Sequence, residues 1–308
     1  MAGTYVSDLG NLLYAGLDAV FNSALKAPRQ TYYKNIVHQK SVGKKYGWYE
    51  TIGAMGAAYE KLDGAAYTFD KIEDGAKTTI TNKEYAKGVE ATRQALKYDL
   101  YSTLQKTFGA PLVSRLVQLK EKAVADAYND GFTNTGADGV AIFSNSHPLQ
   151  NDPAKLNDNL ASGALTPDNL IAAKNMFNAI YDQGGEFFDT MPTHLLIHPN
   201  KKYLALQILM SNLMALELSN TKNVVQDVMP VKLIENKYID YNTSTGVSPW
   251  FLIDMTLTDA GCVLQQEGGT ELKTWEDNNT GNLRGVARED WGVGFVSPGY
   301  CVVASSGS

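Results

Sequence analysis

The segment 46–92 most constrains the fold of this chain. It consists largely of strand-forming, aromatic and glycine residues and reads as a long arm that folds back on itself, with no second layer to pack against. Asp63-Gly64 lies between aromatic residues and favours positive φ at both central positions of a tight hairpin turn. Asp74-Gly75 is a second candidate for the tip. An isolated two-stranded hairpin is marginal in water, and unpaired strand edges recruit partners. We therefore predict a projecting hairpin completed by another copy of the chain, with packing on its own domain as the alternative.

Aromatic residues gather in this segment, at Tyr46, Trp48, Tyr49, Tyr59, Tyr67 and Phe69. Side chains with an apolar body and a polar tip are favoured at protein interfaces, although strands also carry aromatic residues for their own packing. We predict that these residues form an assembly interface together with Asp63 and Gly64 of the turn. Leu13 and Leu17 of the N-terminal segment are predicted to contact a further copy.

Charge and composition exclude several classes of protein. The 308 residues include 33 acidic and 27 basic ones, a formal net charge of −6, and the longest basic runs are pairs such as Lys44-Lys45. A protein that binds nucleic acid tightly through its phosphates usually shows a basic stripe. This sequence has no such stripe, so tight binding of nucleic acid is not expected. With 44% hydrophobic residues, the chain can form a sizeable core and about two domains.

The N-terminal residues are apolar at helical spacing up to Pro28, but Asp8 and Asp18 interrupt the run and no basic region precedes it. We expect an amphipathic helix and no signal peptide, and no stretch approaches the roughly 20 apolar residues that cross a bilayer. Cys262 and Cys301 stand far apart, without C-x-x-C spacing. Neither a disulfide framework nor a thiolate metal site is therefore indicated, and a reducing compartment fits.

A long helix is predicted next, because apolar residues recur every three or four positions. These residues, which are predicted to form its buried face, are Leu104, Phe108, Leu112, Leu116, Leu119, Ala123 and Ala127. Pro111 lies inside the pattern. Since proline removes a helical hydrogen bond, the helix is predicted either to kink there or to divide in two with Pro111 in the first turn of the second half. Asp130-Gly131 is predicted to end it.

The remainder mixes helices and strands. The composition between 134 and 163 turns to Asn, Asp, Gly, Ser and Pro, which indicates an irregular connection and a domain boundary. Thr166 as N-cap and Pro167 begin a helix that Gly184-Gly185 is predicted to stop, and Asn200 opens another. Strands are predicted at His194–His198, Val231–Ile234, Trp250–Ile253, Cys262–Gln265, Leu272–Trp275 and from Leu283 to Val303. Because helices and strands do not alternate throughout, the fold class is α+β.

Two motifs invite a chemical interpretation. His194 and His198 have i, i+4 spacing, but the intervening residues favour a strand, which would hold the two rings about 13 Å apart at roughly 3.3 Å per residue, too far to share one zinc ion. His147 and Ser144 lie in a serine-rich loop, yet a serine hydrolase also needs an orienting carboxylate and an oxyanion hole, and no G-x-S-x-G elbow exists. We predict no catalytic residue, no cofactor and no metal, and keep a soluble hydrolase using His147 and Ser144 as a weaker alternative.

Read together, several short motifs resemble the major capsid proteins of tailed bacteriophages, and specifically the Mu-like major head subunit group. The motifs are Asp138-Gly139 with Phe143-Ser144 and His147-Pro148, Leu195-Leu196-Ile197-His198-Pro199 with Ala205 and Ile208-Leu209, Trp250-Phe251-Leu252-Ile253-Asp254, and Arg288-Glu289-Asp290-Trp291-Gly292-Val293-Gly294-Phe295. Each motif is short, so the resemblance depends on their number and on their order over almost the whole chain.

The resemblance implies the Hong Kong 97-type fold, which has an N-terminal arm, an extended β-hairpin loop, a peripheral domain with a long spine helix, and an axial domain. On this chain these would be residues 1–40, 41–92, 93–145 together with 284–308, and 146–283. Family members that crosslink covalently use a lysine of the extended loop with an asparagine and a glutamate. No motif places such a trio here, so Lys61 and Lys71 are not assigned that role.

The resemblance also implies the function. We expect a structural protein, not an enzyme, that self-assembles as hexamers and pentamers of an icosahedral shell around phage double-stranded DNA. The expected partners are other copies of the chain, a scaffolding protein, a portal, decoration proteins and non-specifically packaged DNA, with no membrane. The expected location is the virion capsid, and the host cytoplasm during assembly. A nanocompartment shell that encloses cargo enzymes is the alternative within the same fold.

Overall fold

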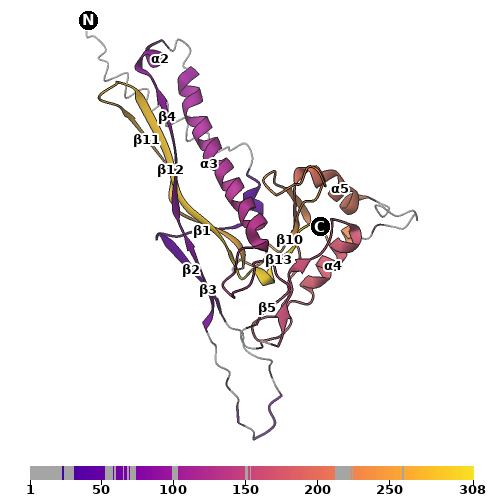
Figure 1. Ribbon diagram of the computed structural model, residues 1–308. Helices are drawn as coiled ribbons and strands as arrows, with labels where there is room; N and C mark the ends of the chain where they lie inside the picture. Colours follow the sequence, from indigo (N-terminus) through magenta and orange to yellow (C-terminus); the bar gives the residue numbers. More distant parts are fainter. Residues whose placement is uncertain are drawn as a thin grey trace.

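A long sheet and the helix that lies along it form a narrow limb, and a second lobe lies beside that limb (Figure 1). The computed structural model describes residues 23, 31–52, 58, 60–64, 66–67, 69, 74–98, 103–149, 152, 154–211, 223, 225–258 and 260–308. Helices and strands interleave between residues 160 and 235 but not elsewhere in this part of the chain, and the mixed α and β content agrees with the predicted class.

Four strands form the long sheet in the order β1-β11-β12-β4. Their bounds are β1 His38–Ser41, β11 Gly261–Glu276, β12 Leu283–Val296 and β4 Lys83–Ala91. β11 and β12 are an antiparallel hairpin, β4 is antiparallel to β12, and β1 is parallel to β11. The two strands predicted at Cys262–Gln265 and Leu272–Trp275 lie within β11, which is continuous through a register shift between Glu267 and Glu271. Gly268 has a φ of 67° at this irregularity, a conformation that glycine adopts without strain.

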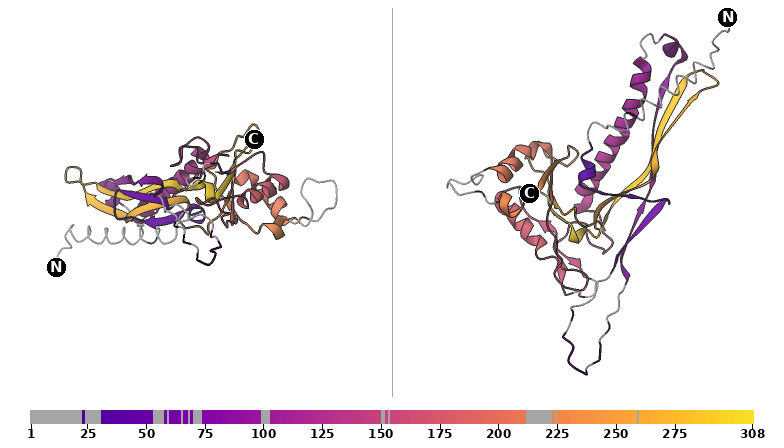
Figure 2. Two further views of the ribbon diagram at one scale, coloured as in Figure 1. Left: turned by 90° about the horizontal axis from the view of Figure 1, so that it is seen from below. Right: turned by 180° about the vertical axis from the view of Figure 1, so that it is seen from behind.

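Helix α3 (Thr103–Asn129) follows the short helix α2 (Arg93–Lys97) and runs along one face of the long sheet (Figures 1 and 2). It continues through Pro111, so the predicted division into two helices is wrong. Helix α3 ends at Asn129, and the 3-10 turn η2 (Asp130–Phe132) follows, at the predicted Asp130-Gly131.

The buried face of α3 includes Leu112 and Leu116, as predicted, but departs from the predicted stripe at Leu119. Leu119 is 37% exposed, whereas Lys120 and Glu121 are each only 6% exposed. The apolar period placed Leu119 inside because it takes no account of partners elsewhere in the chain. Lys120 and Glu121 face polar groups of β12 and of the 3-10 turn η1 (Tyr33–Asn35), and a charged side chain tolerates burial when such groups pair it.

Strands β2 (Tyr46–Ile52) and β3 (Asp74–Thr81) form the predicted antiparallel hairpin, with a register shift between Glu50 and Ile52. They leave the limb at the end opposite α2 (Figure 1). The paired ribbon is shorter than the segment 46–92, because β4 turns back and pairs with β12 in the long sheet. Asp74-Gly75 lies in β3 and not at a turn, so the second candidate for the tip is wrong.

The second lobe contains a five-stranded sheet in the order β7-β13-β10-β8-β9. The strands are β7 Leu160–Ala161, β13 Val302–Ser305, β10 Trp250–Ile253, β8 His194–Ile197 and β9 Lys232–Glu235, and the helices are α4 Pro167–Phe177, α5 Lys202–Met210 and α6 Val225–Val228. Every residue of β10 and β13 is buried, which explains their nearly continuous apolar sequences. A small sheet of β5 (His147–Pro148) and β6 (Leu156–Asn157) lies near it.

Local signals set some boundaries and missed others. Thr166 caps α4 by accepting a hydrogen bond from the Asn169 backbone N–H, and Pro167 occupies the first turn, as predicted. Helix α4 ends at Phe177, however, well before Gly184-Gly185. His198 lies just outside β8, where its side chain caps the 3-10 turn η3 (Pro199–Lys201) that precedes α5.

Two strands, β11 and β13, pair with strands on the other side of a predicted domain limit. β11 lies within 146–283 but belongs to the long sheet, because it pairs with β12 over most of its length. β13 lies within 284–308 but pairs with β10 in the second lobe, after the turn η4 (Pro298–Tyr300). The chain therefore passes between the two sheets more than once.

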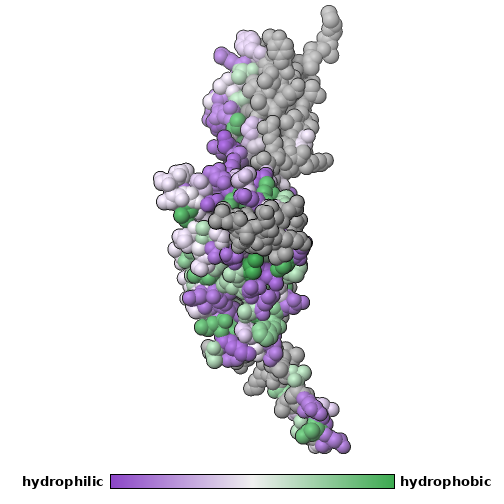
Figure 3. All heavy atoms as spheres, turned by 90° about the vertical axis from the view of Figure 1, so that its right-hand side faces the viewer, coloured by the Kyte–Doolittle hydropathy of each residue, from purple (hydrophilic) through white to green (hydrophobic). Residues whose placement is uncertain are grey.

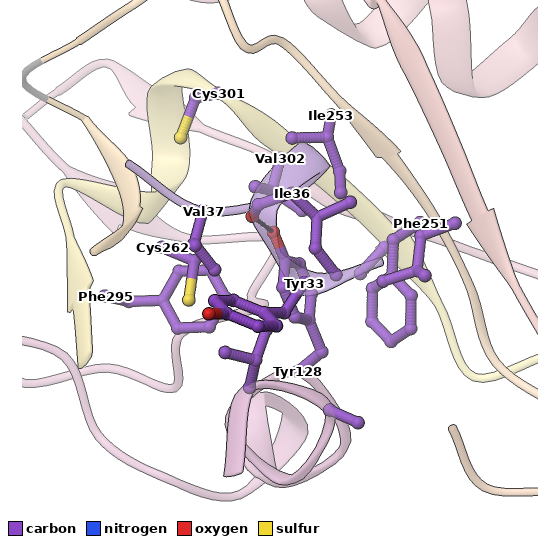
Figure 4. Packing of buried hydrophobic residues seen from close by; sticks show 14 of the residues in the cluster. Tyr33, Ile36, Val37, Tyr128, Phe251, Ile253, Cys262, Phe295, Cys301 and Val302 are labelled. Carbon is purple, nitrogen blue, oxygen red and sulfur yellow. Dashed lines mark hydrogen bonds between the residues drawn. The ribbon is translucent and has the colours of Figure 1, made fainter. Parts of the chain in front are cut away.

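A shared aromatic core joins the limb to the second lobe (Figure 4). The Tyr128 ring of α3 lies 5.1 Å from the Phe251 ring of β10 and 5.0 Å from the Phe295 ring of β12, with edge-to-face angles of 65° and 83°. Its hydroxyl donates a 2.8 Å hydrogen bond to the carbonyl oxygen of Ile36. Aromatic pairs of this geometry add about 0.5–1.5 kcal/mol each beyond their buried area, so the lobe and the limb are held as one unit.

Candidate assembly interface

The outer face of the hairpin carries two exposed aromatic side chains. Tyr46 and Trp48 of β2 are 46% and 76% exposed, and their rings stack with centroids 5.5 Å apart. Residues i and i+2 of a strand point to the same face, so the alternation of β2 places the pair together. An exposed tryptophan of this kind is typical of a surface that another protein covers.

The far end of the arm carries further apolar groups. Leu62, Tyr67 and Phe69 are 70%, 69% and 89% exposed, and Lys61 places its ammonium group 5.0 Å from the centroid of the Tyr67 ring. Figure 3 shows hydrophobic and hydrophilic residues side by side on the projecting end. All three apolar side chains are therefore mostly exposed in the single chain.

Asp63 and Gly64 form a turn, but not of the predicted type. Gly64 has a φ of 77°, whereas the single non-glycine residue with positive φ among those described is Ser297. Asp63 therefore does not adopt the positive φ that a type I′ turn requires at both central positions. β2 ends at Ile52 and β3 begins at Asp74, so Asp63-Gly64 does not join two paired strands directly and need not adopt the tight two-residue geometry that the dipeptide alone suggested. Three other predicted interface residues, Leu13, Leu17 and Tyr59, lie outside the described residues.

Tyr49 occupies the opposite face of β2 from Trp48 and lies against its own subunit. It packs on the cluster of Ile80, Val263 and Val296, and its hydroxyl donates a 3.0 Å hydrogen bond to Gln265 Oε1. Burial raises the pKa of the Tyr49 phenol above its usual value. The base of the hairpin is thus attached to the long sheet, while Trp48 faces away from it.

A buried ion pair crosses from α3 to the long sheet. Lys120 Nζ lies 2.9 Å from Glu289 Oε2, with side-chain exposures of 7% and 5%. Lys120 also donates a 3.2 Å hydrogen bond to Gln266 Oε1, and the Thr270 hydroxyl donates to Glu289 Oε1. The pair is not predicted from the sequence, because a lysine next to an apolar stripe usually lies in solvent.

Glu121 holds the segment that precedes β1. Its two carboxylate oxygens accept hydrogen bonds of 3.2 and 3.1 Å from the Tyr33 backbone N–H, and Asn236 Nδ2 lies 3.3 Å from the same carboxylate. Burial raises the pKa of Glu121 to about 7, although the hydrogen bonds from the backbone oppose that rise. The first described residues after the N-terminal segment are therefore attached to the middle of α3.

The serine-rich loop does not form a nucleophile and base pair. His147 is 5% exposed and both of its ring nitrogens have partners, with Nδ1 2.5 Å from Asp138 Oδ2 and Nε2 3.1 Å from Asn159 Oδ1. The Ser144 hydroxyl pairs with the Ser146 hydroxyl at 3.2 Å. Burial acts to raise the pKa of Asp138, but the hydrogen bond and the charge of His147 outweigh it and hold that pKa below its usual value. The arrangement fixes the loop against β6 and β7 and resembles a structural network, not a hydrolytic site.

The other histidines and the cysteines do not assemble a metal site in the described residues, which contain no group of three His, Cys, Asp or Glu side chains that could hold an ion. His194 Nδ1 lies 2.9 Å from the Thr193 hydroxyl, and His198 stacks on Tyr241 at 4.7 Å. Burial lowers the pKa of both histidines below the usual value. Cys262 and Cys301 are buried and are not joined in a disulfide. No helix among the described residues has the length and apolar character that a bilayer crossing requires.

Comparisons with known proteins identify one family and a shared fold. Residues 75–304 match the family described as phage capsid protein. No curated protein matches.

A virus-like particle from Pyrococcus furiosus has 12% identity over 95% of this chain and 98% of its own, with a TM-score of 0.56. The capsid of the cyanophage P-SCSP1u has 11% identity over 90% and 88%, with a TM-score of 0.58. The SrpI encapsulin of Synechococcus elongatus PCC 7942 has 12% identity over 92% and 89%, with a TM-score of 0.53. At these identities, the likeness to solved structures concerns the fold alone.

Proposed function

The chain belongs to the phage capsid protein family, and from that premise we propose how it builds the head of a tailed phage. It is a major capsid protein, a structural subunit that self-assembles into the icosahedral shell of the virion. We assign it the Hong Kong 97-type architecture and the Mu-like major head subunit group. The motifs from Asp138-Gly139 to Phe295 support that assignment, as does the likeness of fold to solved capsids.

The two sheets support a division into functional parts. The peripheral domain contains the long sheet, the short helix α2 and the long helix α3, which is the spine helix. The axial domain contains the five-stranded sheet with α4, α5 and α6. The extended loop is the β2–β3 hairpin with its tip, and residues before η1 form the N-terminal arm. This division follows strand pairing, so it assigns β4 and β11 to the peripheral domain and β13 to the axial domain.

Assembly proceeds by exchange of arms between subunits. The observation that carries this proposal is the exposure of Trp48, Tyr67 and Phe69 on a ribbon that projects beyond its own limb. Burying a large aromatic side chain contributes roughly 1.5–3 kcal/mol, and each subunit repeats the contact around the lattice. Modest individual contacts therefore sum to a stable closed shell.

The remaining partners follow from this role. A separate scaffolding protein guides assembly in the host cytoplasm, a portal occupies one vertex, and decoration proteins bind the outer surface. The packaged double-stranded DNA contacts the inner wall non-specifically, and a net charge of −6 suits a wall that does not hold phosphates strongly. The fold is also that of the SrpI encapsulin, so a shell around cargo enzymes is the competing function. DNA in particles isolated from infected cells supports the head, whereas enzyme cargo supports the compartment.

The arm is tested by replacing both tip rings, Tyr67→Ser with Phe69→Ser. The subunit is expected to keep its circular dichroism spectrum, while sedimentation and electron micrographs show few or no closed particles. The matched control exchanges the rings, Tyr67→Phe with Phe69→Tyr, and is expected to assemble. Unfolding of the serine variant as a single subunit would show that these rings belong to its own core. Normal shells from it would refute the role of the arm.

A further inference from the structure

Among the described residues, the hairpin meets the long sheet of its own subunit at a contact that we call the hairpin base. It comprises residues 47–49 of β2 and residues 80–82 at the end of β3. Ile80 is 4% exposed and packs with Tyr49 on Val263 and Val296 of the long sheet. Apolar contact alone is non-directional, so it would allow the ribbon to slide or rotate on the sheet.

Gln265 supplies directional bonds at this contact. Its side chain is fully buried, and its Nε2 donates hydrogen bonds of 2.7 Å to the carbonyl oxygen of Ile80 and 2.8 Å to Asn82 Oδ1. Its Oε1 accepts the 3.0 Å hydrogen bond from the Tyr49 hydroxyl. One amide therefore uses both of its hydrogens and its oxygen to hold both strands of the hairpin.

Asn82 extends the same attachment to the chain before β2. Its backbone N–H donates to the carbonyl oxygen of Lys45 at 2.8 Å, and its Nδ2 donates to the carbonyl oxygen of Lys44 at 3.1 Å. Asn82 is 7% exposed and separates β3 from β4. The network thus joins the hairpin to the point where β4 enters the long sheet.

Three glycines make room for this close approach. A Cβ atom at Gly47 would lie 2.2 Å from Gln265 Oε1, and a Cβ at Gly292 would lie 2.6 Å from the carbonyl oxygen of Thr81. A Cβ at Gly294 would lie 2.9 Å from Ile80 Cγ1. The absence of side chains at these positions lets the hairpin base reach the amide of Gln265.

We propose that Gln265 is a positioning residue that fixes the angle at which the hairpin leaves its subunit, and through that angle the curvature of the shell. The inference rests on the proposed function, because the hairpin must reach a neighbouring subunit for its angle to matter. A small rotation at the base becomes a large displacement at the exposed rings of Tyr67 and Phe69. Directional bonds of a buried amide set such an angle more sharply than the apolar contact around it.

The test replaces Gln265 by a residue of similar size that can neither donate nor accept these bonds, Gln265→Met. In the unassembled subunit, the amides of β3 are expected to exchange hydrogen about tenfold faster, because buried partners lose their hydrogen bonds. The amides of α3 are expected to exchange at the wild-type rate. In assembled material, electron micrographs are expected to show a broader distribution of particle diameters than for the wild type.

Gln266→Met is the matched control, because Gln266 is the next residue of β11 and its side chain meets Lys120 of α3. This variant is expected to leave hydrogen exchange of β3 unchanged. Wild-type exchange in β3 of the Gln265→Met subunit, or wild-type particle diameters, would overturn the proposal. If Gln265→Met does not fold, Tyr49→Phe removes one of the three hydrogen bonds and is expected to speed exchange in β3 about threefold. Unchanged exchange in that variant would also overturn it.

The exchange measurement on the subunit separates this inference from the proposed function. A wild-type chain that never forms shells would contradict the head function, whatever the behaviour of Gln265. A wild-type chain that forms uniform shells, together with a Gln265→Met chain that forms the same ones, would retain the function and reject the role of Gln265.

Discussion

Removing the cation of the buried pair between α3 and β12 should destabilise the subunit strongly. In Lys120→Met, Glu289 stays 5% exposed at its side chain and loses the ammonium group 2.9 Å away. Breaking a buried pair by removing one partner costs about 3–5 kcal/mol. The hydroxyl of Thr270 still donates to Glu289, and the methionine still fills the apolar space of the lysine stem, so the lower end, about 3 kcal/mol, is expected.

The measurement is equilibrium urea denaturation of the unassembled subunit, with the free energy of unfolding taken from the midpoint and slope. Lys122→Met is the matched control, since Lys122 lies on the same helix but is exposed, and its effect should stay within about 0.5 kcal/mol. The double variant Lys120→Met with Glu289→Gln removes both charges and should recover most of the loss. A cost below about 1 kcal/mol for Lys120→Met, or no recovery in the double variant, would refute the reasoning that an unpaired buried carboxylate dominates.

Two further outcomes are expected. Burial raises the pKa of Glu121 from 4.5 to about 7, so the folded state keeps the carboxyl proton to higher pH than the unfolded state does. The protonated carboxyl therefore contributes its full stability below pH 4.5, and this contribution is lost as the pH rises through about 7. Glu121→Gln should therefore flatten the decline of the free energy of unfolding across that window, and urea midpoints that fall in parallel with those of the wild type would contradict this. Gly292→Ala should cost about 1–3 kcal/mol in the same assay, because its Cβ would meet the carbonyl oxygen of Thr81 at 2.6 Å. Gly269→Ala, which meets nothing within 4 Å, is the control and should be close to neutral.

Local patterns predicted several elements well because their signals act over a few residues. The threonine N-cap and the proline of α4, the apolar run of β10, and the strand character of β2 and β3 all depend on residues within the segment itself. The same reasoning predicted a ribbon with exposed aromatic residues, and Trp48, Tyr67 and Phe69 are exposed.

Errors arose wherever a distant partner decided the outcome. The phase of the buried face of α3 follows the partners of Lys120 and Glu121, which lie on β12, on β11 and in η1. The length of the ribbon depends on β4, which pairs with β12, a strand about 200 positions later in the chain. Periodicity carries no information on such partners, because a hydrogen bond across the sheet leaves no mark on the spacing of residues near it.

The sequence alone determined that this protein has a projecting aromatic ribbon, a long helix and a mixed α and β body, since propensity, period and turn residues specify these locally. Only the tertiary structure decided how the ribbon is attached. The attachment brings together three separate parts of the chain. They are the buried Gln265 of β11, the glycines Gly292 and Gly294 of β12, and the hairpin base of β2 and β3. Their meeting depends on the packing of two sheets and a helix, which no local pattern encodes.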